Sequence, residues 1–262
     1  MGGSGNHTRA LRGDIKGWSA ATARRHTHWL WQVRADDLDG VGFAITLTLR
    51  DTPATAEDFH RMRRAWLKRV ERQGATRVHW VIEWQERGTP HLHAAVYYPP
   101  MPDSVPDARH ARAVVSWLEV CDAAGIDASW ASQDAKSIHG ALGWLKYLAK
   151  HASRGANHYQ RQGAPDGWEK TGRMWGHWGP WPTTEPVVLD DLNNREFWRL
   201  RRLVRNWARN QAAATGDWSR LRYLRRAGRP NNRHQSSYQG VSEWIPEYVT
   251  LRLIDFFERE SL

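Results

Sequence analysis

The sequence predicts an α+β domain built around an antiparallel hairpin. Residues 77–85 and 91–98 are rich in β-branched and aromatic side chains, and residues 87–90 between them have the composition of a turn. Residues 43–49 alternate as a strand does, whereas residues 55–73 repeat their apolar side chains at helical spacing. Short strands with helices between them are typical of an antiparallel sheet that has helices packed on it.

The chain before the first strand has little apolar patterning. Residues 1–5 are rich in glycine and have the composition of an appended linker. Residues 6–40 are polar and basic without a clear period, which predicts either an arm that lies on DNA or a poorly ordered leader. After the strand at residues 43–49, Thr55 is placed to cap the first helix of the domain.

Two further elements follow the hairpin. A proline-rich break at residues 99–102 separates it from a helix predicted at residues 107–124, and a short strand is predicted at residues 129–136. Cys121 is the single cysteine, so the sequence encodes neither a disulfide framework nor a thiolate zinc site. Because it falls within a predicted helix, we expect Cys121 to be a buried residue without a catalytic role.

The last part of the chain is predicted to be a helical, basic extension. Three prolines at positions 180, 182 and 186 mark a linker, and residues 189–214 form a long helix in which arginines alternate with apolar and aromatic side chains. Residues 220–233 are strongly basic, and residues 244–257 could form a closing helix. The region could bind duplex DNA, pair protomers or brace the preceding domain.

Composition points to a nucleic-acid partner. The 262 residues carry a net charge of +10, with a pI of about 10.2, as expected of a protein that binds a polyanion. The 17 tryptophans suit stacking of unpaired bases, although ordinary packing accounts for most of them. There is no phosphate-binding glycine loop that would predict an ATP site, no apolar stretch of membrane-spanning length and no signal peptide. We therefore expect a cytoplasmic protein that acts without ATP or a membrane.

The hairpin carries a candidate metal site. His91 and His93 lie two residues apart on a strand and so share a face. Glu83 joins them if the loop has an odd number of residues, and a loop of residues 87–89 or 86–90 sets Glu83 opposite His93. A two-residue turn would instead break the cluster. Two imidazoles and a carboxylate on a rigid sheet make a three-ligand metal site with open positions.

Other assignments of this site remain open. A His-x-His pair arises readily by chance, and His26-Thr27-His28 is a second one, with no hairpin before it and no carboxylate in register. We expect that pair to be at the surface or structural. Gln85, Glu86 and His79 are rival ligands, and Gln85 and His79 have the same strand parity as Glu83.

A helix predicted to start near residue 138 carries a candidate nucleophile. Tyr147 falls almost opposite the centre of the helix's apolar stripe, so its ring is not expected to pack into the core. Lys150, one turn further on, could lower the pKa of the phenol or balance a phosphate charge, and two glycines would let a nucleotide backbone approach. The alternative is an exposed tyrosine on a solvated basic face. The stripe consists of Ile138, Leu142, Leu145, Ala149 and Ala152, and the side of Tyr147 also carries Gly140, Gly143, Lys150, His151 and Arg154.

Taken in order, these motifs resemble those of the HUH endonucleases, in particular the single-tyrosine rolling-circle replication initiators of plasmids, phages and small single-stranded DNA viruses. Ile45–Thr48 looks like the first motif, a strand involved in DNA contact. His91-Leu92-His93 matches the His-hydrophobic-His motif, and Glu83, eight residues upstream of it, stands at the position of the third metal ligand. Tyr147 and Lys150 match the Tyr-x-x-Lys nucleophile motif.

The resemblance implies a fold and a division of the chain. It implies a central, about five-stranded antiparallel sheet flanked by helices, an HUH or RRM-like nuclease fold with metal and tyrosine on one face. The nuclease domain would span residues 41–182, with a last strand at residues 173–179. Residues 1–40 would form a leader or basic arm and residues 183–262 the helical extension.

The resemblance also implies a reaction. Mg²⁺ or Mn²⁺, held by Glu83, His91 and His93, would assist attack by Tyr147 on a phosphodiester. The products would be a 5′-phosphotyrosyl link and a free 3′-hydroxyl, and the substrate would be single-stranded DNA at a replication origin or hairpin. A host helicase and polymerase would be partners. Tyr159 is expected to be structural. His151 could stand near Tyr147 as a proton acceptor, but we expect it to be a solvated helix-end residue. Low-ranked candidates for DNA contact are Thr46, Thr48, Arg87, Lys146 and Arg154.

Two other functions are left open. Within the same family of enzymes, the alternative is a transposase or a mobilisation relaxase; Lys150 beside the tyrosine and only two histidines in the central motif favour the replication initiator instead. From another class, the alternative is a non-enzymatic, basic DNA-binding regulator. That function leaves the residues around Tyr147 unexplained.

Overall fold

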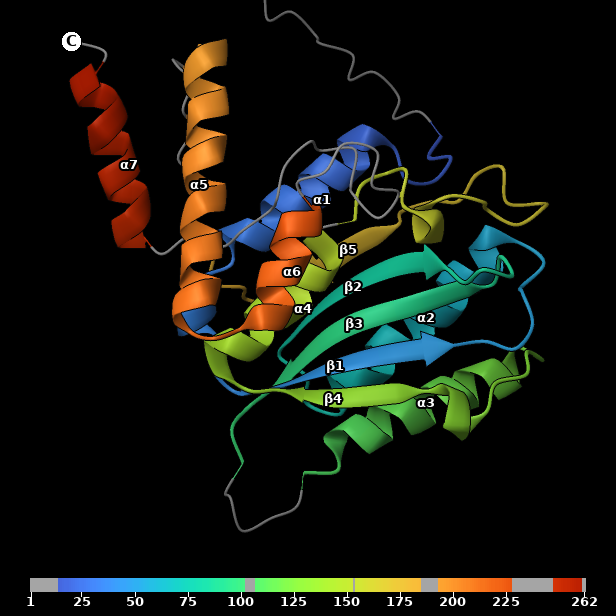
Figure 1. Ribbon diagram of the computed structural model, residues 1–262. Helices are drawn as coiled ribbons and strands as arrows, with labels where there is room; N and C mark the ends of the chain where they lie inside the picture. Colours follow the sequence, from blue (N-terminus) through green and yellow to red (C-terminus); the bar gives the residue numbers. More distant parts are fainter. Residues whose placement is uncertain (1–13, 102–106, 153, 185–192, 228–246, 261–262) are drawn as a thin grey trace, which may run out of the picture.

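A five-stranded antiparallel sheet forms the centre of the molecule (Figure 1). The computed structural model describes residues 14–101, 107–152, 154–184, 193–227 and 247–260. The strand order is β4-β1-β3-β2-β5, which confirms the predicted α+β class and sheet. The strands are β1 (Val41–Thr48), β2 (Arg77–Trp84), β3 (Pro90–Tyr98), β4 (Asp134–Ile138) and β5 (Trp175–Trp178).

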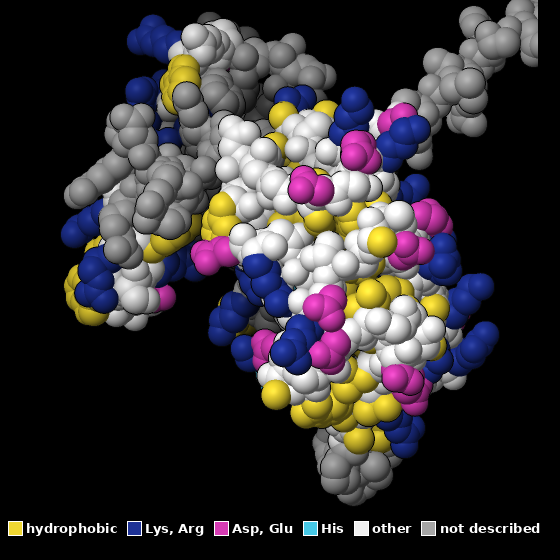
Figure 2. All heavy atoms as spheres, turned by 90° about the vertical axis from the view of Figure 1, so that its right-hand side faces the viewer, with side chains coloured by type: hydrophobic (Ala, Val, Ile, Leu, Met, Phe, Trp, Pro, Cys, Tyr) yellow, Lys and Arg dark blue, Asp and Glu magenta, His cyan; other side chains and the backbone are white. Residues whose placement is uncertain are grey.

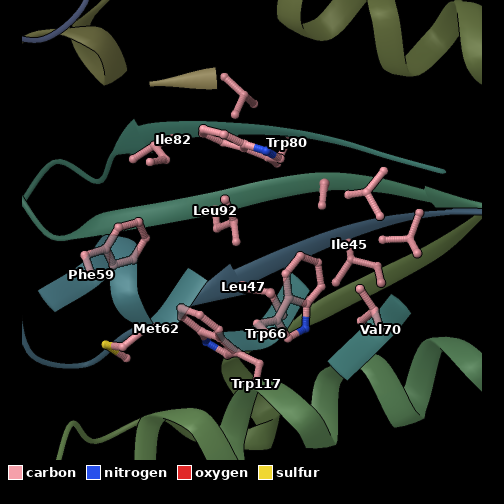
Figure 3. Packing of buried hydrophobic residues seen from close by; sticks show 14 of the residues in the cluster. Ile45, Leu47, Phe59, Met62, Trp66, Val70, Trp80, Ile82, Leu92 and Trp117 are labelled. Carbon is pink, nitrogen blue, oxygen red and sulfur yellow. The ribbon is translucent and has the colours of Figure 1, made fainter. Parts of the chain in front are cut away.

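One face of the sheet is covered by α2 (Ala56–Arg72) and α3 (Arg109–Ala123), which pack on each other. Apolar side chains from alternate strand positions point into this layer, where Figure 3 shows Leu47 and Leu92 facing Trp66 and Trp117. The indole Nε1 of Trp66 donates to the carbonyl of Ala113 at 2.8 Å, which satisfies its one polar group inside the core. Cys121 is buried in α3, as expected.

The other face is covered by α1 (Ala20–Gln32) and α4 (Gly140–Ala152), which contact each other. Its apolar cluster is smaller and more aromatic, with Trp29 of α1 and Trp144 of α4 packed over Tyr97 of β3. Figure 1 shows α2 behind the strands, with α1 and α4 toward one end of the sheet. Candidate site residues from β1, β2, β3 and α4 lie on this second face.

Helix α1 contradicts one of the two expectations for residues 6–40, the poorly ordered leader, in the part of this stretch that the structure describes; residues 6–13 lie outside the described residues. Ser19 caps it by accepting a hydrogen bond from the backbone of Thr22 at 3.1 Å, and one side of the helix is buried. That side consists of Ala23, His26, Trp29 and Leu30, at helical spacing. The spacing of apolar residues does not predict this helix, because its buried side includes a histidine, which counts as a polar residue.

Several boundaries differ from prediction by a few residues. Thr55 does cap α2, accepting from the backbone of Asp58 at 3.1 Å. The strand predicted at residues 129–136 begins later, as β4, because Trp130–Ser132 form a 3₁₀ turn. The last strand predicted at residues 173–179 is present as β5.

The C-terminal region contains α5 (Asn194–Ala214), α6 (Trp218–Ala227) and α7 (Glu247–Glu260). A capping box between Asn193 and Glu196 starts α5. Arg199 of α5 lies 4.7 Å from the ring centre of Phe256 in α7, so these helices lie side by side, as Figure 1 also shows. The basic run at residues 220–233 lies partly outside the described residues.

The surface charge is mixed on the side of the molecule shown in Figure 2. Lys and Arg side chains there are interspersed with Asp and Glu and with apolar side chains. The net charge of +10 is therefore not concentrated on that side. Among the described residues, no helix combines the length and the apolar character needed to cross a membrane.

Candidate active site

The β2–β3 hairpin places Glu83 and the two histidines on one face. Glu83 pairs with His91 across the two strands, and the backbone of Gln85 donates to the carbonyl of Thr89 at 3.0 Å. The loop therefore consists of residues 86–88, an odd number, as the shared face requires. The predicted register is wrong by two residues, because Gly88, with φ of 81°, takes the left-handed position that closes a three-residue loop.

Threonine hydroxyls of β1 hold the two imidazoles. Thr46 Oγ1 lies 3.0 Å from Nδ1 of His93, and Thr48 Oγ1 lies 3.5 Å from Nδ1 of His91. Both pairs are directly opposite each other in the β1–β3 register. A metal-binding histidine commonly uses one ring nitrogen for the ion and the other for such a hydrogen bond. The two rings, with centres 4.5 Å apart, thus keep Nε2 for other partners.

Glu83 is fully buried and lies at the centre of a charged cluster. Its carboxylate forms ion pairs with Arg154 at the end of α4 and with Nε of Arg161 at 3.4 Å. The same carboxylate lies 3.3 Å from Nε2 of His93. Burial and the charge of Arg161 lower the pKa of Arg154 to about 10, which leaves the guanidinium charged at neutral pH. Arg154 was a candidate for DNA contact and instead neutralises a carboxylate inside the protein.

His151 lies between the hairpin and Tyr147. Its ring centre is 5.0 Å from that of His93 and 4.7 Å from that of Tyr147, and the residue is fully buried. The expectation of a solvated helix-end histidine is therefore wrong. Burial, followed by the charges of its neighbours, lowers its pKa well below the usual value, so the ring is neutral.

Tyr147 also faces the sheet, which contradicts the prediction that it points away from the core. It is 7% exposed, its ring stacks on that of Trp144, and its hydroxyl lies 2.9 Å from Nδ1 of His79. Burial raises the pKa of the phenol well above 10, the reverse of the lowering expected from Lys150. Of the predicted apolar stripe, Ile138 and Ala152 are buried as expected, whereas Leu142 is 64% exposed and the large ring of Tyr147 takes an inward position. The side chains of Leu145 and Ala149 lie outside the described part of the structure.

The glycine and lysine positions of α4 have distinct roles. A Cβ on Gly143 would meet the backbone of Ile138 at 3.0 Å, so this glycine permits close packing within the protein, not the approach of a nucleotide. Lys150 is exposed, and its charge contributes to lowering the pKa of His91 and of His93, the latter to about 3 mainly through burial.

The remaining candidates occupy different places. Arg87 in the hairpin loop is exposed and donates to the Gln85 side chain at 2.8 Å and to the carbonyl of Leu49. Lys146 is exposed on α4. Of the rival ligands, Gln85 lies 3.5 Å from Nδ1 of His91, Glu86 is exposed in the loop and His79 binds Tyr147.

Two imidazoles and a carboxylate are suitable ligands for a divalent ion, but these side chains are not arranged around a common metal position. No three His, Cys, Asp or Glu side chains among the described residues converge closely enough to hold a metal ion as they stand. Nε2 of His93 is buried, and within the described part of the chain it has no hydrogen-bond partner. It faces the Glu83 carboxylate, as a ligand nitrogen would. The carboxylate would have to exchange its pairing with Arg154 for the metal.

Three residues of this cluster were not anticipated. Arg161 comes from a 3₁₀ turn after α4 and has no signal in the sequence, because nothing local relates it to Glu83. His79 was considered only as a ligand. His26 belongs to the His-x-His pair that was set aside as surface or structural, and it is buried against His79.

Sequence comparisons identify relatives. Residues 42–156 match the family model described as replication-associated protein ORF2/G2P. The chain is 42% identical over 254 residues to a putative replication protein of Xylella fastidiosa (strain 9a5c), covering 94% of this chain and 87% of the relative. It is 38% identical over 256 residues to the replication-associated protein G2P of Pseudomonas phage Pf3, covering 97% and 90%. No solved structure matches.

Proposed function

The chain belongs to the family of replication-associated proteins of the ORF2/G2P type, and we propose that it initiates replication by nicking and rejoining single-stranded DNA. One observation carries this proposal. The β2–β3 hairpin and α4 bring Glu83, the histidine pair and Tyr147 to the same face of the sheet, with His151 in contact between them. Nucleotidyl transfer through a tyrosine needs a nucleophile and a charge-stabilising group on one surface.

The metal-binding residues would be His91, His93 and Glu83. When bound, Mg²⁺ or Mn²⁺ would polarise the scissile phosphate and offset the charge that builds on it. Thr46 and Thr48 orient the two imidazoles through their Nδ1 atoms, so that both Nε2 atoms point away from β1. Neutral imidazoles are required of metal ligands, and burial keeps the pKa of both below the neutral range.

Tyr147 is the proposed nucleophile. Its oxygen would attack phosphorus, forming a 5′-phosphotyrosyl bond and releasing a free 3′-hydroxyl that a host polymerase could extend. The covalent link preserves the energy of the phosphodiester, so the same residue can rejoin the ends without ATP. Lys150, one turn after Tyr147 on α4, would balance the phosphate charge. Because the hydroxyl is buried in this state, the side chain must move before attack.

Single-stranded DNA would lie along the exposed cations beside this face, among them Lys150 and Lys146. A cavity of about 850 Å³ opens beside β5, with Trp175 and Arg173 among its lining residues. Aromatic faces next to cations suit a splayed base and its phosphate. Thr46, Thr48 and Arg154 are engaged within the protein and are not exposed, whereas Lys146 and Arg87 are exposed, although Arg87 also bonds to Gln85 and Leu49. Lys146 and Arg87 are therefore the better candidates for DNA contact.

The test of this function is formation of a covalent protein–DNA adduct. A library of labelled single-stranded oligonucleotides is mixed with the protein and Mn²⁺ and resolved on a denaturing gel. The wild type should give an SDS-resistant band that EDTA and Tyr147→Phe abolish. Tyr159→Phe is the matched control, because Tyr159 is 57% exposed and its ring stacks on that of His158.

Other results would point to other functions. Tight, salt-sensitive binding without any cleavage would favour a non-enzymatic DNA-binding regulator. Cleavage without an adduct would mean that water attacks the phosphate, and Tyr147 would lose its role as nucleophile. An adduct formed only on transposon ends or on a transfer origin would favour a transposase or a relaxase.

A further inference from the structure

A chain of two buried histidines lies behind Tyr147. The hydroxyl of Tyr147, on α4, lies 2.9 Å from Nδ1 of His79, on β2. The other nitrogen of that ring, Nε2, lies 3.0 Å from Nε2 of His26, on α1. Both histidines are fully buried. Residues from three separate elements are thus connected by two hydrogen bonds that end at the proposed nucleophile.

The donor and acceptor groups of Tyr147, His79 and His26 determine which residue donates in each of these two hydrogen bonds. A phenol is a better donor than a neutral imidazole, so Tyr147 donates to Nδ1 of His79, which then carries its proton on Nε2 and donates to His26. His26 is left with its proton on Nδ1, which has no partner among the described residues. The reverse direction would strand two groups, the phenol hydroxyl and the same ring nitrogen of His26, and is less favourable.

Aromatic packing fixes the rings in place. Trp29 of α1 stacks on His79 with ring centres 4.9 Å apart and planes 15° apart, and His26 lies almost parallel to His79 at 5.1 Å. Trp144 stacks on the ring of Tyr147 itself. A side chain held by both packing and a directed hydrogen bond has one preferred rotamer.

We propose that His79, held in turn by His26, is a positioning residue that keeps the Tyr147 hydroxyl bonded inside the protein, so that the tyrosine reaches a phosphate only after this bond breaks. The proposal rests on the proposed role of Tyr147 as nucleophile. A hydroxyl in a 7% exposed residue, bonded on its inner side, cannot contact a DNA phosphate from this position. His79 thereby sets the fraction of molecules in which Tyr147 is available.

Two substitutions at one position separate this role from general packing. In His79→Asn, the amide oxygen replaces Nδ1 and can still accept from Tyr147. In His79→Gln, the longer side chain replaces Nε2, keeps the contact with His26 and removes the acceptor of Tyr147. The two variants are both polar amides, so a difference between them reports on which hydrogen bond was lost.

The first readout is nitration of Tyr147 by tetranitromethane, without DNA or metal, measured by mass spectrometry. Leaving a buried hydroxyl without its partner should shift the side chain outward and raise the nitration rate of His79→Gln about tenfold. His79→Asn should retain slow nitration. Tyr159, which is 57% exposed in the same protein, is the internal reference. Equal rates for Tyr147 in the wild type and His79→Gln would overturn the proposal.

The second readout is the rate of adduct formation with single-stranded DNA and Mn²⁺. His79→Gln should form adduct faster than His79→Asn. Faster nitration with slower adduct formation would contradict the proposal, because His79 would then assist the attack. If His79→Gln does not fold, His26→Leu replaces it and should raise nitration less strongly. Absence of any adduct in the wild type would refute the proposed function, whereas the nitration result would still stand.

Discussion

The two faces of the sheet are built from alternate residues of the same strands and differ in chemistry, because only the face toward α1 and α4 buries charged groups beside its apolar cluster. Toward α2 and α3 the strands present Ile45, Leu47 and Leu92, packed against buried tryptophans. Toward α1 and α4 they present Glu83 and His93, held by arginines and threonine hydroxyls. Leu92 and His93 are neighbours in sequence, yet Leu92 packs in the apolar core and His93 belongs to the polar cluster around Glu83.

In this fold, the main apolar core and the candidate functional residues lie on opposite faces of the sheet. The apolar face gains free energy simply by excluding water from its side chains. Burying ionised and imidazole groups on the other face costs free energy unless each finds a partner. Such groups are retained where they serve a reaction, so the polar face is the place to look for function.

The largest expected effect is the loss of the buried charge of Glu83. Glu83→Gln would leave Arg154 and Arg161 without a counter-charge inside the protein, and should lower the free energy of unfolding by about 3–5 kcal/mol. Urea unfolding followed by circular dichroism measures this. The matched control is Glu119→Gln, at an exposed ion pair with Arg69, which should cost less than about 1 kcal/mol. Similar losses for both would show that the buried cluster contributes no more than a surface pair.

Adjacent substitutions on opposite faces should separate stability from metal binding. Leu92→Ala should reduce the free energy of unfolding by about 2–5 kcal/mol, because a fully buried leucine is lost from a packed core. Its affinity for Mn²⁺, measured by titration calorimetry on the folded protein, should be unchanged. His93→Gln should lower the free energy of unfolding less than Leu92→Ala does, and should greatly reduce the affinity for Mn²⁺. Equal affinity in all three proteins would exclude His93 as a ligand.

The smallest expected effect is the contribution of each buried histidine to the pH dependence of the free energy of unfolding. Burial lowers the pKa of His26, His79 and His151 well below 6.5, so the unfolded chain binds more protons than the folded one below that pH. Stability is therefore fully present above pH 6.5 and is lost on acidification. Below pH 6.5, each such imidazole should lower the free energy of unfolding by about 1.4 kcal/mol per pH unit of acidification. Urea unfolding at pH 7 and pH 5 measures this, and equal stabilities would contradict the burial of these rings.

The sequence predicted this site in part, for reasons that the residues make clear. Strand alternation placed His91 and His93 on one face, and a loop with an odd number of residues was the condition for Glu83 to join them. The observed loop is odd, and this parity survives an error of two residues in register. The predicted orientation of α4 is wrong at Leu142, which is exposed, and at Tyr147, which is buried, although Ile138 and Ala152 are buried as predicted. A stripe of aliphatic residues is a poor guide where large amphipathic rings compete for the buried side.

Other parts of the site had no local signal. Arg161 reaches Glu83 from a turn 78 positions further along the chain, and no periodicity relates the two. His26 lies in a helix whose buried side includes a histidine and a tryptophan, so neither its fold nor its role followed from apolar spacing. Long-range pairing of polar groups depends on the assembled fold, which local patterns do not encode.

The central claim, that Tyr147 forms the covalent link, is tested most directly by locating the attached nucleotide. The adduct formed with single-stranded DNA and Mn²⁺ is digested with nuclease and trypsin, and its peptides are analysed by mass spectrometry. Cleavage after Lys146 and after Arg154 separates the peptide of Tyr147 from that of Tyr159. We expect the nucleotide mass on Tyr147-Leu148-Ala149-Lys150. A nucleotide on any other residue, or cleaved DNA with no modified peptide, would contradict the claim.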